Sequence, residues 1–160
     1  MYTFIRADSD NEDFKRLVVL LDEELEKRDG EEHAFYDQFN KIENIKNVIV
    51  AYTEQQPVAA GAFKEFSPQA VEIKRMFVMP AFRGRGIAFQ ILQQLENWAA
   101  GLGYSYCILE TGKKQPEAIA LYKKSGYKVI PNYGQYENVA NSVCMKKELL
   151  SESEFSEFLN

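Results

Sequence analysis

The sequence predicts a single α/β domain over residues 1–150, in which a run of antiparallel strands precedes a β-α-β crossover. Three observations support this prediction. The chain has 160 residues, enough for one substantial core and too few for two. Hydrophobic residues make up 46% of it and charged residues 27%, as in folded globular proteins. Strand-like and helix-like hydrophobic patterns alternate along the chain.

The first half of the chain predicts one strand, two helices and three more strands. Residues 2–7 read as the first strand, and Ser9 and Glu12 have the spacing of a capping box before an amphipathic helix. The apolar face of that helix contains Phe14, Leu17, Val18, Leu21 and Leu25. A short second helix with loops is expected within residues 29–46. An antiparallel meander follows, formed by the strand-like segments 47–54, 57–66 and 70–79.

The second half predicts two helices and three strands. One helix begins near Ile87 and ends near Gly101, and residues 104–110 read as a buried strand. Pro116 suits the first turn of the next helix, and Gly126 ends it. Two strands follow, and the acidic tail is expected to be a loose terminal helix; these segments are 127–130, 142–149 and 151–160.

Charge and composition argue against several classes of protein. A formal net charge of −5 disfavours broad nucleic-acid binding, which needs a basic surface. Charged residues lie too early for a signal peptide, and no apolar run approaches the roughly 20 residues of a membrane span, so a cytoplasmic protein is expected. Cys107 and Cys144 lie in apolar segments and are expected to be buried, reduced thiols. With His33 they offer no metal-ligand spacing, and no metal is expected.

The segment MFVMPAFRGRGIAFQIL, residues 76–92, joins a strand-like run to a helix-like run through a basic, glycine-containing turn. The unpaired N–H groups at the start of a helix attract anions, and Gly84 and Gly86 allow the backbone to approach a phosphate. Arg83 and Arg85 add positive charge, so a pyrophosphate is the expected ligand. The alternative is an exposed basic helix start. The Walker pattern is absent, and Phe89 replaces the third glycine of the dinucleotide pattern.

Two segments resemble the GCN5-related N-acetyltransferase (GNAT) family, and the resemblance extends from about residue 4 to 149. Arg83, Gly86 and Ala88 fill the family's cofactor motif [QR]-x-x-G-x-[GA]. Gln115 stands where many relatives have Asn, as in a bacterial subgroup of small-molecule acetyltransferases. The later family segment is matched by Leu121, Tyr122, Lys124, Gly126 and Tyr127. The resemblance implies a GNAT-type acyl-CoA N-acyltransferase fold, a mixed sheet of about seven mostly antiparallel strands with helices on both faces.

The same resemblance implies acetyl-CoA as co-substrate and assigns residues to it. The pantetheine arm is expected to pair with the backbone of the fourth strand at Phe77 and Val78, and the Val78 N–H to face the thioester oxygen. Gln115 and Tyr122 are expected beside the cofactor. The pyrophosphate is expected at the turn formed by Arg83, Gly84, Arg85, Gly86, Ile87 and Ala88.

Two residues are candidates for proton transfer. Tyr122 matches the family's general-acid tyrosine, although its spacing from Ala118 and Ile119 also suits a core aromatic residue. Glu72 lies on the predicted fourth strand at the position of the base in the family's histone acetyltransferases. The alternative for Glu72 is a strand carboxylate paired with Lys74 or Arg75.

The acceptor is expected to be the amine of a small molecule. Residues predicted to line its pocket are Phe35, Tyr36, Phe39, Asn132, Tyr133 and Tyr136. Acidic residues of the first helices either attract a cationic amine or form a solvated face; they are Asp22, Glu23, Glu24, Glu26, Glu31 and Glu32. A protein or peptide amine as acceptor and a catalytically silent acyl-CoA-binding module remain alternatives. The sequence leaves the oligomeric state open, a homodimer included.

Overall fold

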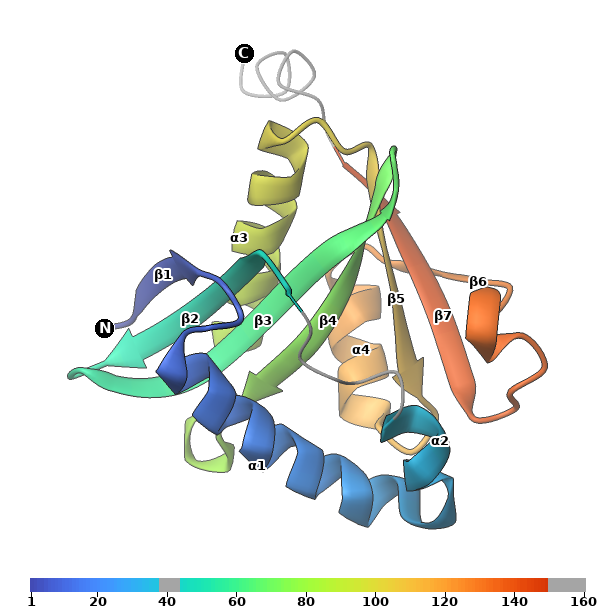
Figure 1. The fold of residues 1–160 in the computed structure, drawn as a ribbon, viewed down its shortest axis with the longest axis horizontal. Helices are drawn as coiled ribbons and strands as arrows, with labels where there is room; N and C mark the ends of the chain where they lie inside the picture. Colours follow the sequence, from blue (N-terminus) through green and yellow to red (C-terminus); the bar gives the residue numbers. More distant parts are fainter. Residues whose placement is uncertain (38–43, 150–160) are drawn as a thin grey trace. The chain divides into compact units, whose positions relative to one another are not determined.

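A seven-stranded mixed sheet with the order β1-β2-β3-β4-β5-β7-β6 forms the framework of the protein (Figure 1). The computed structural model describes residues 1–37 and 44–149. The β4–β5 pair is parallel, whereas β1–β2, β2–β3, β5–β7 and β6–β7 are antiparallel, so the expected mixed, mostly antiparallel sheet is confirmed. The strands are β1 Thr3–Ala7, β2 Asn47–Thr53, β3 Gln56–Ser67, β4 Ala70–Val78, β5 Tyr106–Gly112, β6 Lys128–Ile130 and β7 Ser142–Glu148.

The helices lie within the segments where the sequence predicted them. They are α1 Glu12–Asp29, α2 His33–Asp37, α3 Ile87–Gly101 and α4 Pro116–Lys124, with short 3-10 turns at Gly30–Glu32 (η1), Pro80–Phe82 (η2) and Gly134–Tyr136 (η3). The chain divides into two compact units, the first formed by residues 1–64 and 74–95 and the second by residues 65–73 and those from 96 onward. The acidic tail at 151–160 lies outside the described residues.

The start of α1 differs from the expected capping box. The cap is Asn11, whose side-chain oxygen accepts a hydrogen bond of 2.9 Å from the N–H of Phe14. Ser9 uses its own N–H to bind the carbonyl oxygen of Ile45 instead. Asparagine is as good an N-cap as serine, and its oxygen reaches the third helical N–H from the position directly before the helix. The prediction placed the helix correctly but named the wrong capping residue.

In the first unit, helices pack on both faces of the sheet. Phe14, Leu17 and Val18 of α1 join one core cluster with Ala60 and Ala62 of β3. Side chains alternate between the two faces of a strand, so the intervening position 61 faces the opposite side. A Cβ atom at Gly61 would meet Ile91 and Leu95 of α3 and Met76 of β4. Helices α1 and α3 therefore cover opposite faces of the strands in this unit.

Replacing Gly61 with Ala should destabilise the protein by about 1 to 3 kcal/mol, because the added methyl group overpacks a filled space. Its Cβ would lie 2.8 Å from Cγ2 of Ile91 and 3.0 Å from Cδ1 of Leu95. The matched control is Gly101→Ala at the end of α3, where a Cβ atom has nothing within 4 Å. Urea unfolding of both variants measures the difference; equal stability of Gly61→Ala and wild type would show that the α3 contact is not tight.

In the second unit, β7 lies between β5 and β6 and pairs with both. Glu96, in the last part of α3, forms a polar network with other residues of this unit. The carboxylate of Glu96 is 7% exposed and accepts hydrogen bonds from the Tyr127 hydroxyl at 2.9 Å and from the Lys147 ammonium at 2.7 Å. Burial and nearby Glu96 raise the pKa of the Cys107 thiol to about 12. Cys107 and Cys144 are both free and buried, as expected.

Candidate active site

The turn between η2 and α3 has the backbone geometry that its glycines suggested. Gly84 and Gly86 adopt φ angles of 81° and 78°, in the left-handed region that favours glycine. A Cβ atom at either position has no neighbour within 4 Å, so the space beside the turn is open. Helix α3 begins directly afterwards at Ile87, which is 1% exposed and anchors the helix start in the core. The helix therefore presents its first N–H groups and its positive dipole end at an open turn.

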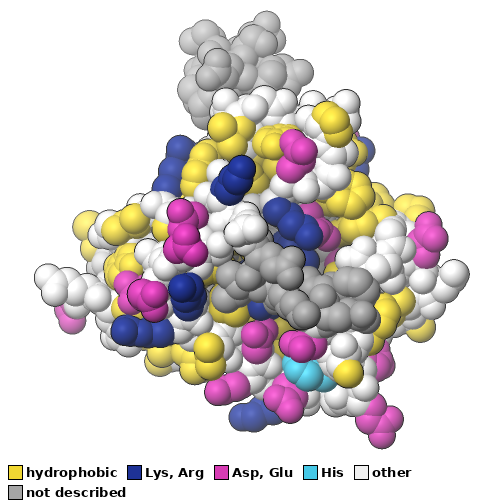
Figure 2. All heavy atoms as spheres, viewed as in Figure 1, with side chains coloured by type: hydrophobic (Ala, Val, Ile, Leu, Met, Phe, Trp, Pro, Cys, Tyr) yellow, Lys and Arg dark blue, Asp and Glu magenta, His cyan; other side chains and the backbone are white. Residues whose placement is uncertain are grey.

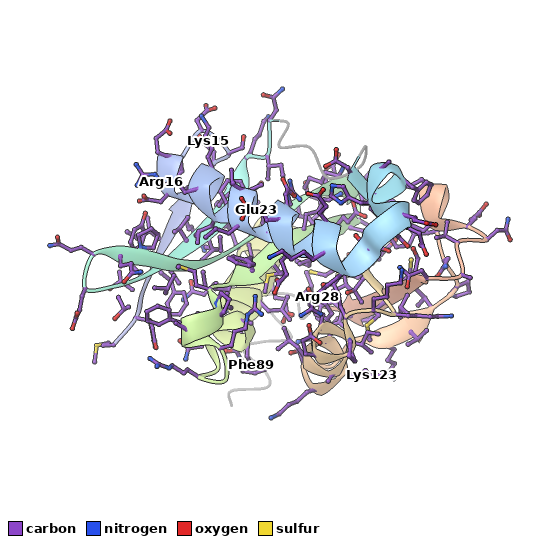
Figure 3. All side chains as sticks on the ribbon, turned by 90° about the horizontal axis from the view of Figure 1, so that it is seen from below. Lys15, Arg16, Glu23, Arg28, Phe89 and Lys123 are labelled. Atoms are coloured by element: carbon purple, nitrogen blue, oxygen red, sulfur yellow. The ribbon has the colours of Figure 1, made fainter. Side chains whose placement is uncertain are left out.

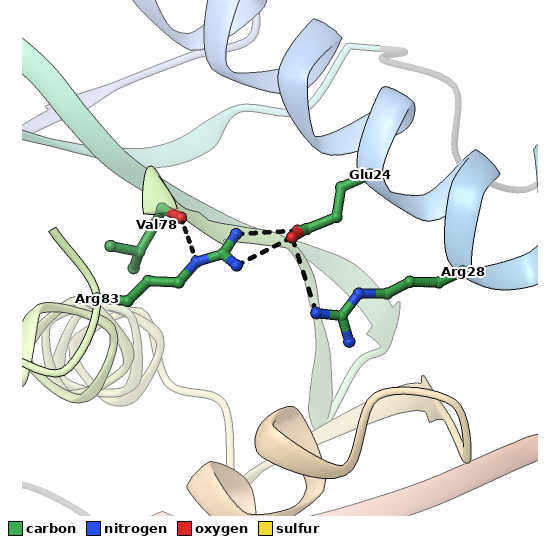
Figure 4. Close-up of polar contacts among 4 residues, drawn as sticks. All are labelled: Glu24, Arg28, Val78 and Arg83. Carbon is green, nitrogen blue, oxygen red and sulfur yellow. Dashed lines mark hydrogen bonds and ion pairs between the residues drawn. The ribbon is translucent and has the colours of Figure 1, made fainter. Parts of the chain in front are cut away.

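Both arginines of this turn contact other protein groups. The Arg83 guanidinium donates from Nε to the carbonyl oxygen of Val78 at 2.8 Å and lies against the Glu24 carboxylate of α1 (Figure 4). Arg85 donates to the Tyr2 hydroxyl at 3.3 Å, and its guanidinium lies 5.3 Å from the centre of the Phe82 ring. The expected charge is thus present at the turn, with that of Arg83 paired to a carboxylate.

The end of β4 that precedes the turn contains an irregular residue. Arg75 has a φ angle of 60°, unusual for a residue with a side chain inside a strand, and it is 7% exposed. Its guanidinium binds both carboxylate oxygens of Asp22 on α1, at 3.1 and 3.5 Å. Burial raises the pKa of Asp22 and lowers that of Arg75, and their mutual attraction opposes both shifts. Phe77 and Val78 follow and are 6% and 9% exposed.

In the second unit, Glu72 of β4 lies among aromatic side chains. The Tyr133 hydroxyl donates a hydrogen bond of 2.7 Å to Oε2 of Glu72, which is 4% exposed. The Tyr133 ring stands edge-to-face with Phe66 and Tyr136, at centroid distances of 5.2 and 5.8 Å. Burial and the Glu72 charge raise the pKa of Tyr133 above its ordinary value. Of the two alternative partners of Glu72, Arg75 binds Asp22 instead.

The sequence did not point to Glu110 of β5, whose carboxylate lies near Tyr136. Burial raises the pKa of Tyr136, and the charges of Glu110 and Glu72 raise it further. Burial raises the pKa of the Cys144 thiol to about 11, and the charges of the same two carboxylates add to the increase. Glu110 ends the hydrophobic run YSYCILE, and that change from apolar to acidic was the only sequence signal.

Tyr122 of α4 is buried in the second unit, with 7% of its surface exposed. Its ring stands edge-to-face with that of Tyr127 at 5.8 Å. Burial raises the pKa of its hydroxyl, and the charge of Glu110 adds to the increase. Gln115 occupies the N-cap position of α4 without capping the helix through its side chain. A Cβ atom on Gly112 would lie 3.7 Å from Nε2 of Gln115.

The expected acceptor residues divide between the two units. Tyr133, directly before η3, and Tyr136 of η3 lie together near Glu72 in the second unit. Phe35 and Tyr36 belong to α2 in the first unit, where their rings meet edge-to-face at 5.2 Å. Phe39 lies outside the described residues.

The described part of the chain contains no group of three or more His, Cys, Asp or Glu side chains arranged to hold a metal ion. None of the described helices is both long enough and apolar enough to cross a membrane. On the face seen in Figure 2, lysine and arginine side chains are interspersed with acidic ones.

Comparison with known proteins agrees with the turn motif and the sheet. Residues 14–127 match the acetyltransferase (GNAT) family, and the chain belongs to that family. It is 41% identical over 78 residues to an IAA acetyltransferase of Azospirillum brasilense, a match that covers 49% of this chain and 51% of the relative. The chain thus spans about half the length of that curated relative.

Solved structures share the fold over nearly the whole chain. A candidate acyl-CoA N-acyltransferase of Klebsiella pneumoniae has a TM-score of 0.78 and 26% identity, covering 93% of this chain and 98% of its own. A GNAT family acetyltransferase of Elizabethkingia anophelis, solved with acetyl-CoA bound, has a TM-score of 0.67 and 16% identity, covering 92% and 98%. The GNAT-type fold expected from the sequence is confirmed.

Proposed function

We propose that the protein is an acetyl-CoA-dependent N-acetyltransferase that transfers the acetyl group directly to the amine of a small molecule in a ternary complex. The turn after β4 carries this proposal. It has the family's cofactor motif in sequence, left-handed glycines at 84 and 86, and an open space at the start of α3. A protein of the same fold from Elizabethkingia anophelis has acetyl-CoA bound.

The pyrophosphate of the cofactor would bind at this turn, where helix N–H groups and the positive dipole end favour an anion. The space beside Gly84 and Gly86 suits a ligand that contacts the backbone closely. The pantetheine arm would pair with the backbone of Phe77 and Val78, as an added strand does. The Val78 N–H would donate to the thioester oxygen as negative charge develops on it.

Replacing Gly86 with Val should raise the dissociation constant of acetyl-CoA by roughly 10-fold or more. The new side chain would occupy the open space beside the turn and strain a backbone with a φ angle of 78°. Gly30→Val is the matched control, because Gly30 also has a positive φ, 57°, and open space around its Cβ position. Titration calorimetry of the folded variants measures both; unchanged affinity in Gly86→Val would remove the turn from the cofactor site.

In the transfer, the neutral amine attacks the thioester carbonyl carbon and the new C–N bond forms. The C–S bond then breaks, CoA leaves as a thiolate, and the nitrogen gives up a second proton to solvent. The attacking amine must first lose the proton of its ammonium form. We assign that proton to Glu72, directly or through a water molecule. The carboxylate of Glu72 is nearly buried and accepts a hydrogen bond from the Tyr133 hydroxyl. This fixed position supports its assignment as the proton acceptor.

Tyr122 is assigned as the group that donates to the departing CoA sulfur. Its raised pKa keeps the hydroxyl protonated throughout the neutral range. A thiol has an ordinary pKa of about 8.5, so complete proton transfer from Tyr122 to the thiolate is uphill. Tyr122 therefore acts mainly as a hydrogen-bond donor that stabilises the thiolate as charge develops on it, and solvent supplies the final proton.

The acceptor is proposed to be a small cationic amine. In the second unit, the charges of Glu110 and Glu72 add to the increase that burial causes in the pKa of Tyr136. The rings of Tyr133 and Tyr136 stand edge-to-face. Carboxylates and aromatic faces are the groups that attract a cation before it is deprotonated. Phe35 and Tyr36, in the first unit, stay a prediction from the sequence.

A screen of amines, polyamines, amino acids and peptides, read by CoA release from acetyl-CoA, tests the proposal. Release that depends on a small amine is the expected result. Release only with peptides would assign the acceptor to proteins. Acetyl-CoA binding without release for any acceptor would indicate a catalytically silent acyl-CoA-binding module.

A further inference from the structure

Two carboxylates of α1 bind arginines, one within β4 and one in the turn after it. Asp22 binds the guanidinium of Arg75 inside β4, and Glu24 binds that of Arg83 in the turn that follows. These acidic side chains therefore form neither the solvated face nor the free negative field that the sequence suggested. All four residues belong to the first unit, and the two ion pairs bracket the backbone of Phe77 and Val78.

The pair between Glu24 and Arg83 has the fork geometry of a charge-assisted double hydrogen bond (Figure 4). Nη1 of Arg83 lies 2.9 Å from Oε1 of Glu24, and Nη2 donates to Oε2 at 3.0 Å. Nη2 of Arg28, one helical turn further along α1, lies 3.8 Å from the same carboxylate. The Arg83 guanidinium is thus fixed in one orientation, with its Nε directed at β4.

The peptide group after Val78 is held at both of its polar atoms, and Arg83 holds one of them. Arg83 Nε donates to the Val78 carbonyl oxygen at 2.8 Å, and the N–H of Met79 donates to the carbonyl oxygen of Val58 at 2.9 Å. The Arg83 guanidinium carbon also lies 5.6 Å from the centre of the Phe77 ring. Arg83 therefore contacts both residues whose backbone is assigned to pantetheine.

We propose that Glu24 is a positioning residue for acetyl-CoA, acting through Arg83 to fix the end of β4 in its cofactor-binding geometry. This inference rests on the proposed function. It changes the role of Arg83 from a direct phosphate ligand to a link between α1 and the Val78 carbonyl. Arginine suits this role better than lysine because its planar fork binds the carboxylate while Nε reaches the backbone.

The direction in which Glu24→Gln changes acetyl-CoA affinity separates this positioning role from the main alternative, competition with the cofactor for Arg83. If Glu24 positions Arg83, Glu24→Gln loosens the end of β4 and weakens acetyl-CoA binding. If Glu24 instead competes with the pyrophosphate for Arg83, removing its negative charge tightens the binding of an anionic cofactor. Glu23→Gln is the matched control, because Glu23 is the neighbouring residue on α1, carries the same charge and is exposed (Figure 3).

Titration calorimetry with acetyl-CoA is performed first on the wild-type protein, then on the variants. We expect Glu24→Gln to raise the dissociation constant roughly 3- to 10-fold, a discounted value for a pair that is about one-third exposed, and Glu23→Gln to leave it unchanged. Arg83→Lys keeps the charge but loses Nε and the fork, so it should weaken binding at least as much. Combining Glu24→Gln with Arg83→Lys should add little, because both act on one link.

Tighter binding in Glu24→Gln, affinity equal to that of Glu23→Gln, or full affinity in Arg83→Lys would overturn the inference and leave the proposed function intact. A wild-type protein that binds no acetyl-CoA would overturn the proposed function itself. The thermal midpoint of each variant provides a second readout, since a merely structural pair would lower the midpoint without changing the affinity of the folded protein.

Discussion

Replacing Glu72 with Gln should lower kcat near neutral pH by on the order of 10² to 10⁴, the usual effect of losing a general base. The substitution preserves the size of the side chain, and the amide oxygen still accepts the Tyr133 hydrogen bond. Because a more alkaline solution supplies the amine already deprotonated, the defect should shrink as the pH rises. Steady-state rates with the identified acceptor, measured from about pH 6 to 9, test this expectation.

Tyr133→Phe is the matched control for Glu72, since it removes only the hydroxyl that donates to the carboxylate. The proposed base stays in place, so turnover should fall by about 10-fold or less, the range of one hydrogen bond to a charged group. If Glu72 only anchors the ammonium, Glu72→Gln should raise the KM of the amine and keep kcat. A rate profile for Glu72→Gln that overlays the wild type at every pH would exclude both roles.

Tyr122→Phe should reduce kcat by roughly 10² or more, with little change in the dissociation constant of acetyl-CoA. The substitution removes only the hydroxyl that we assign to the departing thiolate, an interaction expected to form in the transition state. The ring contact with Tyr127 is retained. Single-turnover rates are the suitable measurement, because they isolate the chemical step from product release.

Tyr127→Phe is the control for Tyr122. Tyr127 is also a buried tyrosine, but its hydroxyl donates to Glu96 in the structural network of the second unit. Its loss should therefore lower the stability of the protein and leave the single-turnover rate of the folded fraction close to wild type. If Tyr122→Phe also lowers stability while keeping the rate, Tyr122 is a core residue and the alternative interpretation is correct.

Local patterns predicted the helices and strands well, because hydrophobic period and turn residues act over a few positions. The sequence could not predict that β7 lies between β5 and β6, since strand order depends on long-range pairing. The sequence analysis also named Ser9 instead of Asn11 as the cap of α1, because both residue types cap helices equally well.

The candidate site was partly predictable for similar reasons. The turn at Gly84 and Gly86 follows from a local motif, and its left-handed backbone is what glycine permits. The partners of charged residues do not follow from local spacing: Glu24 and Arg83 are 59 positions apart. The proximity of Glu110 to Tyr136 likewise depends on how β5 and η3 come together in the second unit.

The most direct test of the central claim is the stoichiometry of a single reaction mixture that contains the protein, acetyl-CoA and the best amine from the screen. We expect one N-acetylated amine, identified by mass spectrometry, for each CoA released, and neither product when the amine is omitted. CoA release without acetylated amine, or acetyl-CoA binding with no product for any amine or peptide, would contradict the assignment of this protein as an N-acetyltransferase.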